Sequence, residues 1–297
     1  MYPFSPLIAI AAVLAMVPYL AAAFFPARAA GSARKLPLPA QILFPSLFAI
    51  PYLLVSFSSG SFSPGWCLLY LFLPVAVTGL LTLGTRSGRA ANSCWPEFLV
   101  LAVIGLAVDL RWFERAWPPH LAIFNKMLLL DAGIYAFVAI RNLERVGFDL
   151  RLRLRDLVIG SREFALYLPV ALALGLGLGF LHLHPFHFDH GRVLAQWVGA
   201  WLFTFFFIAV PEELFFRGWM QNLLERRIGR RPALAVTAVL FGLSHFNKRA
   251  ALFNWRYVLL AAIAGVFYGR AWRQQRRIGA SAVTHATVDS VWSLWLR

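Results

Sequence analysis

Apolar segments follow one another along almost the whole chain, and they constrain the fold more than any other feature. Ten such segments are separated by polar loops. They cover residues 5–25, 41–58, 66–84, 97–113, 121–140, 164–182, 194–216, 232–247, 257–270 and 280–296. A helix needs about 20 apolar residues to cross a bilayer, and the fourth, eighth and ninth segments are shorter than this. The pattern predicts an all-α, polytopic transmembrane helical bundle of about 8–10 spans.

The composition agrees with this prediction. Hydrophobic residues make up 60% of the chain and charged residues only 14%, whereas soluble globular domains carry about 25% charged residues. The first 25 residues have no basic stretch before their apolar run, so we expect a retained first span and not a cleaved signal peptide. The basic residues are 25 arginines and three lysines, a bias typical of GC-rich genomes. We therefore expect an integral membrane protein of a bacterial plasma (inner) membrane.

The net charge of +15 is distributed as a membrane-topology signal. Twenty of the 28 basic residues lie in alternate loops. These loops are residues 26–40, 85–96, 141–163, 217–231 and 270–279. By the positive-inside rule they face the cytoplasm, and both termini face outward. Membrane lipid is thus an expected partner and nucleic acid is not. The two cysteines, Cys67 and Cys94, have no metal-type spacing.

Two adjacent carboxylates and an arginine follow the apolar run 201–210, in the sequence Pro-Glu-Glu-Leu-Phe-Phe-Arg-Gly at 211–218. Each charged group at membrane depth costs about 2.5–3.5 kcal/mol, which favours a function for these groups. Arg217 lies four residues after Glu213, so the two share a helical face and are expected to pair. Glu212 is rotated by about 100° from this face, so we expect it to stay unpaired and to act as a general base. A structural ion pair at a helix end is the alternative.

Two further apolar segments carry ionisable residues at helical spacing. One reads Phe241-Gly-Leu-Ser-His245, and the other reads His285-Ala-Thr-Val-Asp289. Since His285 and Asp289 are four residues apart, the carboxylate is placed to orient the imidazole. A single histidine on an apolar helix is more often a core residue than a catalyst. Two of them together with a glutamate pair favour a catalytic site.

Two expectations concern how these groups meet. Pro211, directly before the glutamates, is expected to kink its helix and to admit water beside Glu212. Straight spans would place Glu212 and His285 towards the cytoplasmic side, with His245 roughly 20 Å from that interface. Tilted or broken helices would be needed to bring the three side chains together.

The three motifs, in this order, resemble the signature of the CAAX prenyl endopeptidase and bacteriocin-processing family of intramembrane proteases, also called the CPBP or Abi family. They read Glu212-Glu213-x-x-x-Arg217, Phe241-x-x-x-His245 and His285-x-x-x-Asp289. The resemblance covers about residues 160–297 and implies an all-α fold with a polar cavity within the membrane. It divides the chain into a protease core, residues 161–297, and N-terminal transmembrane helices of unassigned role, residues 1–160.

The resemblance also implies roles for the motif residues. Glu212 and His245 would activate a water molecule for attack on a peptide carbonyl. Glu213 and Arg217 would hold the site together.

His285 and Asp289 would stabilise the oxyanion. The family commonly has asparagine where this chain has Asp289. An asparagine amide can donate a hydrogen bond to an oxyanion, whereas an ionised aspartate cannot. Asp289 is therefore expected either to be protonated or to orient a cationic His285.

A metal is the open chemical question. Glu212, His245 and His285 form a two-histidine, one-carboxylate set that is compatible with catalytic zinc. No His-Glu-x-x-His motif is present, and we favour a metal-free, glutamate-dependent site without a cofactor. Four of the seven histidines lie in one loop, which we interpret as interfacial, with metal binding or pH sensing as the alternative. They are His182, His184, His187 and His190.

The predicted function is hydrolysis of a peptide bond in a membrane-associated protein or peptide, near its C-terminus or its membrane anchor. Such an enzyme would act in C-terminal processing or sorting, and prenylated CAAX proteins are one version of the substrate. Two alternatives stay open. One is a membrane transporter or proton-relay protein that uses the same buried charges. The other is a catalytically silent immunity or scaffold protein.

Overall fold

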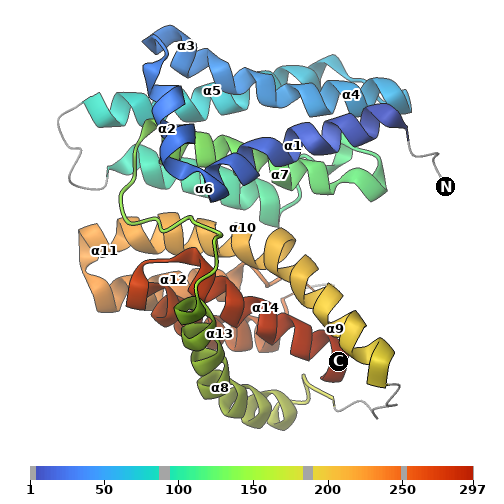
Figure 1. The fold of residues 1–297 in the computed structure, drawn as a ribbon, viewed down its shortest axis with the longest axis vertical. Coiled ribbons are helices and arrows are strands. Elements are labelled where there is room, and N and C mark those ends of the chain that lie inside the picture. The colour runs from blue at the N-terminus through green and yellow to red at the C-terminus, as the bar shows by residue number, and fades with distance from the viewer. Residues whose placement is uncertain (1–4, 87–93, 183–189, 249–252, 297) are drawn as a thin grey trace. The chain divides into compact units, whose positions relative to one another are not determined.

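The structure is a computed structural model of the chain, and it consists of helices (Figure 1). The described residues are 5–86, 94–182, 190–248 and 253–296. None of these residues forms a β-strand, which agrees with the predicted all-α class. The chain divides into two compact units, Met1–Glu144 (unit 1) and Arg145–Arg297 (unit 2). This boundary precedes residue 160, where the sequence motifs placed it.

The described part of unit 1 is built from α-helices with short 3₁₀ segments between them. The elements are α1 Pro6–Phe24, α2 Pro26–Lys35, α3 Leu38–Leu43, a 3₁₀ segment Phe44–Ala49, α4 Ile50–Ser59, α5 Pro64–Arg86, α6 Trp95–Asp109, 3₁₀ turns Glu114–Ala116 and Pro119–Leu121, α7 Ile123–Ile134 and a π-helical end Tyr135–Ile140. Three of these helices begin at a proline, the residue whose fixed φ and missing N–H suit the first helical position. Helix α4 ends at Gly60, which has a φ of 67°.

Buried polar side chains connect the helices of unit 1. The indole of Trp117 donates to the Tyr70 hydroxyl at 2.7 Å, and that hydroxyl donates to Oδ1 of Asn125 at 2.9 Å. The Arg141 guanidinium donates to the Glu97 carboxylate at 2.5 Å. All five side chains are buried. Because each is bonded, the cost of removing these groups from water is offset.

Unit 2 carries all three motifs. Its described elements are α8 Leu154–Gly177, α9 His190–Thr204, a π-helical segment Phe205–Ala209, α10 Val210–Glu213, a second π-helical segment Leu214–Gln221, α11 Asn222–Ile228, α12 Arg230–Leu243, α13 Trp255–Gln275 and α14 Ile278–Trp295. The elements from α9 to α11 follow one another without a break and form one long helical run.

The segment between the unit boundary and α8 is anchored on the start of α14, which explains why it belongs to unit 2. The carbonyl of Gly147 accepts from the backbone N–H of Ile278 at 2.9 Å. Gly147 has a φ of 73°, and a Cβ there would lie 1.8 Å from the carbonyl oxygen of Arg276. Only glycine fits this position. Nearby, the indole of Trp272 donates to the carbonyl of Val146 at 3.1 Å.

Small residues let the helices of unit 2 approach closely. A Cβ on Gly160 of α8 would lie 2.5 Å from Cγ1 of Val283 on α14. The hydroxyl of Thr284 donates to the Gly160 carbonyl at 3.2 Å. A Cβ on Gly242 of α12 would lie 2.5 Å from the carbonyl oxygen of Val258 on α13. These contacts fix the two helices that carry the histidine motifs.

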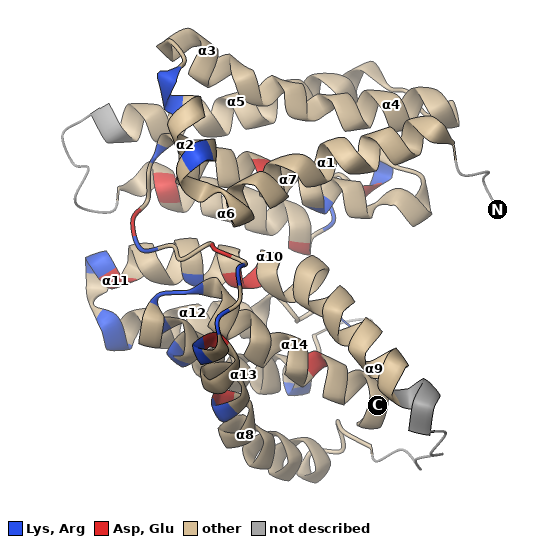
Figure 2. Ribbon diagram, viewed as in Figure 1, with Lys and Arg blue, Asp and Glu red and all other residues tan. Residues whose placement is uncertain are grey.

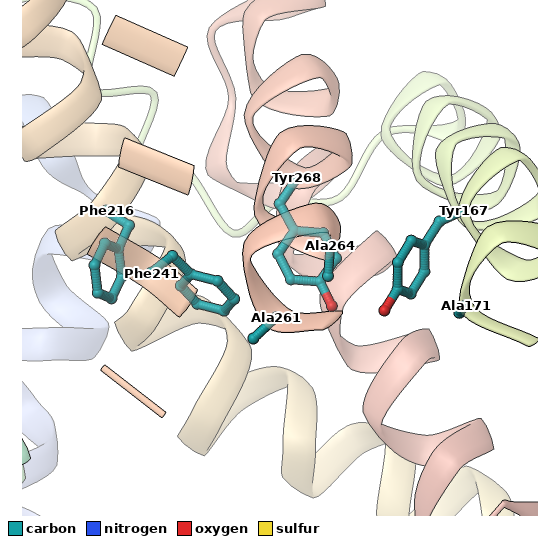
Figure 3. Close-up of a cluster of buried hydrophobic side chains, with 7 residues drawn as sticks. All are labelled: Tyr167, Ala171, Phe216, Phe241, Ala261, Ala264 and Tyr268. Carbon is teal, nitrogen blue, oxygen red and sulfur yellow. The ribbon is translucent and has the colours of Figure 1, made fainter. Parts of the chain in front are cut away.

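A hydrophobic cluster fills the space between α8, α12, α13 and the second π-helical segment (Figure 3). Its buried members are Tyr167, Ala171, Phe216, Phe241, Ala261, Ala264 and Tyr268. Phe216 and Phe241 meet edge to face, with ring centroids 5.0 Å apart. The cluster therefore surrounds the residues of the Phe241 motif with apolar side chains.

Among the described residues, six helical stretches are long and apolar enough to cross a membrane. They are Pro6–Phe24, Leu38–Ser59, Pro64–Gly84, Pro119–Ile140, Leu154–Gly177 and Leu194–Ile228. The chain is thus an integral membrane protein with a polytopic helical fold. The number of such stretches is below the predicted 8–10 spans. Helices α6 and α12 are short, with 15 and 14 residues, and α13 and α14 are too polar because they carry arginines, a histidine and an aspartate.

Candidate active site

The glutamate pair lies in an unusual part of the long helical run. Helix α10, which contains Glu212 and Glu213, has only four α-helical residues and stands between the two π-helical segments. Pro211 lies in this short helix and has no N–H to donate, so the helical hydrogen bonding must change around it. The sequence predicted a kink at this proline, and the structure has π-helical turns on both sides of the pair. Such turns are common at functional sites.

The hairpin between α11 and α12 brings the glutamates and His245 to the same level. The long helix does not end near residue 216, where the apolar run ends, but continues to Ile228. Glu213 lies 16 residues before Gly229, the residue of the turn, and His245 lies 16 residues after it. At about 1.5 Å per residue, both are roughly 24 Å from the turn. Straight, shorter spans would have placed the glutamates and His245 at different depths. In the structure the longer helix removes this difference.

Glu213 and Arg217 form the ion pair that their spacing predicted. The Arg217 guanidinium donates to Oε1 of Glu213 at 3.0 Å, and both side chains are fully buried. A second donation, also at 3.0 Å, goes to the carbonyl of Gly265 on α13. The guanidinium lies over the ring of Phe241, 4.6 Å from its centroid, and 5.3 Å from that of Tyr268. The pair thus ties the long helix to α12 and α13.

His285 is the point at which the carboxylates converge. Its Nδ1 lies 2.9 Å from Oε1 of Glu213, a hydrogen bond. Its Nε2 lies 3.6 Å from Oδ2 of Asp289 and 3.9 Å from Oε2 of Glu212. The imidazole is buried and stacks on Tyr268, with ring centroids 4.6 Å apart. Because acceptors face both ring nitrogens, and a neutral imidazole carries only one N–H, the surroundings favour a ring with protons on both nitrogens.

A second carboxylate, besides the expected one, contacts the His285 ring. The sequence assigned the orienting role to Asp289, which shares a helical face with His285. The contact of 3.6 Å is within ion-pair distance but too long for a hydrogen bond. Glu213, from another helix, makes a hydrogen bond to the other ring nitrogen. A partner on a separate helix cannot be found from spacing along one motif.

Glu212 was expected to remain unpaired, and the structure corrects this. Its Oε1 lies 4.0 Å from the ammonium of Lys248, and its Oε2 faces His285. The Glu212 side chain is 28% exposed, while that of Glu213 is fully buried. Lys248 comes three residues after His245. Sequence reasoning missed it because nothing at helical spacing connects it to Glu212.

His245 lies in the turn directly after α12 and is buried. Its Nδ1 lies 2.9 Å from the carbonyl oxygen of Phe241. Since a carbonyl oxygen only accepts, Nδ1 carries the proton, and Nε2 of the neutral ring is left as an acceptor. Ser244 donates to the same carbonyl at 2.8 Å. The spacing of four between Phe241 and His245 thus positions the ring through the backbone.

A cavity of about 70 Å³ adjoins His245, His285 and Asp289. One water molecule needs about 10–15 Å³, so several fit. The other walls are mainly apolar and aromatic side chains of α8, α13 and α14, and include Tyr167 and Tyr268, whose hydroxyl groups turn towards each other in Figure 3. Among the described residues, Glu212 is not part of this lining. Room for water is therefore found beside the histidines, and Glu212 meets this group through its contact with His285.

Metal binding would depend on how the candidate ligands are arranged. Among the residues that the structure describes, no group of three or more His, Cys, Asp or Glu side chains is arranged to hold a metal ion. In the zinc set considered above, His285 turns both ring nitrogens to carboxylates of other residues, and His245 offers one nitrogen. Of the alternative histidine site, His184 and His187 lie outside the described residues.

Residues 194–291 match the model of one protein family, Rce1-like, which is described as Type II CAAX prenyl endopeptidase Rce1-like. The matched residues lie within unit 2 and include all three motifs. This match confirms the family resemblance that the motifs indicated, and at the family level it supports a peptidase. No curated protein and no solved structure matches the chain.

Proposed function

We propose that this chain, as a relative of the CAAX prenyl endopeptidases over residues 194–291, is a glutamate-dependent intramembrane endopeptidase. Its substrate would be a membrane-anchored protein or peptide, cut during C-terminal processing or sorting in a bacterial inner membrane. The observation that carries the proposal is the convergence of Glu212, Glu213 and Asp289 on His285. This group lies beside a cavity with room for several water molecules, which His245 also lines.

Water activation would fall to Glu212 and His245. As a carboxylate, Glu212 accepts a proton from the attacking water. The Nε2 of His245 accepts a hydrogen bond from the same water, because its Nδ1 is committed to the Phe241 carbonyl. The water oxygen then bonds to the carbonyl carbon of the substrate. When the C–N bond breaks, the proton held by Glu212 passes to the leaving amine.

Stabilisation of the oxyanion would fall to His285. Its Nε2–H points to the space that Glu212 and Asp289 border, and a substrate carbonyl oxygen placed there would accept from it. A cationic donor stabilises the negative charge that develops on this oxygen. Glu213 holds the ring through Nδ1. Asp289, which faces the same nitrogen, would balance the imidazolium charge.

Glu213 and Arg217 would organise the site without touching the substrate, since both are fully buried. Their pair connects the long helix to α13 through the Gly265 carbonyl and presents Glu213 to His285. No step of this mechanism needs a metal.

The test begins by finding a substrate. Membranes that contain the wild-type chain or the Glu212→Gln variant are compared by mass spectrometry for new termini in membrane-anchored proteins. We expect new termini only with the wild type, because the amide cannot act as a base. Glu114→Gln, at a partly exposed residue of unit 1, is the matched control and should behave as the wild type. The same termini in every sample, or none in any, would sink the proposal.

A chelator distinguishes a metal-free, glutamate-dependent peptidase from a metallopeptidase. Cleavage of the identified peptide by the purified chain should be unchanged by phenanthroline, because Glu212 and His245 activate water directly. A loss of cleavage that added zinc restores would show a metallopeptidase. A proton transporter would instead show pH-driven flux and cut no peptide.

A further inference from the structure

Three arginine-rich segments of unit 2 come together at one end of that unit. We call these three segments together the basic end. They are residues 145–163, 225–231 and 270–277. Together they contain 13 arginines and four acidic residues. Figure 2 shows these basic residues around the turn between α11 and α12, at the end of α13 and at the start of α8.

Hydrogen bonds hold the three segments side by side. Arg273, near the end of α13, donates to the Glu225 carboxylate of α11 at 2.5 Å and also to the carbonyl of Arg230. Arg277 follows α13 and donates to the carbonyl of Arg151, before α8, at 2.9 Å. The end of α13 therefore joins the turn between α11 and α12 to the segment before α8.

The acidic residues of the basic end are turned inward. Their side chains are between 0% and 14% exposed, and each is bonded to an arginine of the same end. They are Asp149, Asp156, Glu163 and Glu225. Their carboxylates pair with buried arginines such as Arg277 and with exposed ones such as Arg151, and Asp149 also lies 4.0 Å from Arg153. The 13 arginines still outnumber these four carboxylates, so the net charge of this end stays positive.

The exposed side chains of the basic end, which we call its outer layer, are cationic and apolar. Its exposed arginines include Arg153, Arg155, Arg230 and Arg231. Leu154, which is 78% exposed, stands between two of them, and Ile228, which is 42% exposed, precedes the other two. Cationic heads beside exposed aliphatic side chains are typical of a surface in the headgroup region of a bilayer.

The ends of two candidate spans place this layer at the same depth as lipid headgroups. The stretch Leu154–Gly177 begins at the basic end, and the stretch Leu194–Ile228 ends there. The exposed arginines thus lie where an apolar span meets the polar region of the membrane. The net positive charge of this end is complementary to an anionic membrane surface.

We propose that the basic end is a binding surface for anionic phospholipids, whose phosphate groups the exposed arginines contact while Leu154 and Ile228 lie against the upper acyl chains. Guanidinium groups suit this partner because they bind phosphate oxygens with two parallel hydrogen bonds. This proposal does not depend on the peptidase chemistry and holds for any function of unit 2.

The test uses the purified full-length chain in neutral detergent micelles. A fluorescent phosphatidylglycerol analogue and a matched phosphatidylcholine analogue are titrated against it, and anisotropy reports binding. We expect phosphatidylglycerol to bind at least tenfold more tightly at low salt, and this preference to shrink as salt is added. In a variant with Arg153, Arg155, Arg230 and Arg231 all replaced by glutamine, the preference should disappear.

A control variant carries the same loss of charge elsewhere, at Arg111, Arg115, Lys126 and Arg256, which are also exposed. It should keep the preference, and a four-lysine version of the basic end should keep most of it. Thermal unfolding confirms that each variant is folded. Equal weakening in both glutamine variants, or no preference in the wild type, would overturn the proposal. So would displacement of the lipid by inorganic phosphate alone, which would indicate a site for soluble anions.

Discussion

Two adjacent glutamates of unit 2 differ in the features that decide their chemistry. Glu213 is fully buried and holds both Arg217 and His285. Glu212 is 28% exposed and faces Lys248 and His285 at 3.9–4.0 Å. The first is thus committed to the structure, and the second is the one to which we assign proton exchange. The spacing of the motif predicted this division, although it did not reveal Lys248.

Replacement of Glu213 should mainly affect stability. Glu213→Gln would leave the Arg217 charge buried without its carboxylate, and breaking a buried pair in this way costs about 3–5 kcal/mol. Glu212→Gln should change the free energy of unfolding by less than about 1 kcal/mol, because that side chain is partly exposed. Thermal or denaturant unfolding of both variants in detergent checks the difference. Equal stability of the two variants would contradict the assigned roles.

Asp149 offers a test that depends on pH. Burial would raise the pKa of Asp149, but hydrogen bonds from Arg151 and Arg277 outweigh it and lower this pKa to about 2. Ionised Asp149 therefore stabilises the fold above its ordinary pKa of about 3.9, and this contribution is lost as the pH falls through 2. After solvent screening we expect it to be about 1 kcal/mol or less.

The measurement compares unfolding of the wild type and Asp149→Asn from pH 7 to pH 2. The wild type should be more stable at pH 7, and the difference should narrow below about pH 4. A difference that stays constant or grows as the pH falls would show that Asp149 does not act through its charge.

At the scale of the elements, the ten apolar segments of the sequence all correspond to helical regions of the structure. What hydropathy could not give is where the helices end. The helix with the glutamates runs beyond its apolar stretch to Ile228, because buried polar side chains such as Arg217 and Gln221 continue it. This extension makes the hairpin to α12 and aligns His245 with Glu213. The π-helical turns around Pro211 likewise depend on packing that a local pattern does not contain.

The contact between α8 and α14 should be sensitive to a single methyl group. In Gly160→Ala the new Cβ would lie 2.5 Å from Cγ1 of Val283, so one helix must move. Such overpacking costs about 1–3 kcal/mol. Gly177→Ala in the same helix meets nothing within 4 Å and should change stability by less than about 0.5 kcal/mol. Unfolding of both variants is the measurement, and similar values for the two would refute the close contact.

At the scale of the whole molecule, composition and hydropathy predicted a polytopic helical membrane protein, and the family match agrees with the three motifs over residues 194–291. The sequence motifs predicted which residues would come together in the candidate site. In unit 2 the contacts join five of them, Glu212, Glu213, Arg217, His285 and Asp289. Contacts between residues on different helices, such as Glu213 with His285, could not be predicted from the sequence, because they depend on the tertiary fold. For unit 1 the sequence offers no motif.

The central claim is that Glu212 activates water for peptide hydrolysis in unit 2, and a rate measurement tests it most directly. With the peptide identified in membranes, kcat is determined for the purified wild type and for Glu212→Gln, each shown to be folded by its thermal unfolding. The account predicts that kcat falls by about 10²–10⁴-fold, while the unfolding temperature shifts by no more than about 4 °C. A folded Glu212→Gln chain that cuts the peptide at the wild-type rate would contradict it.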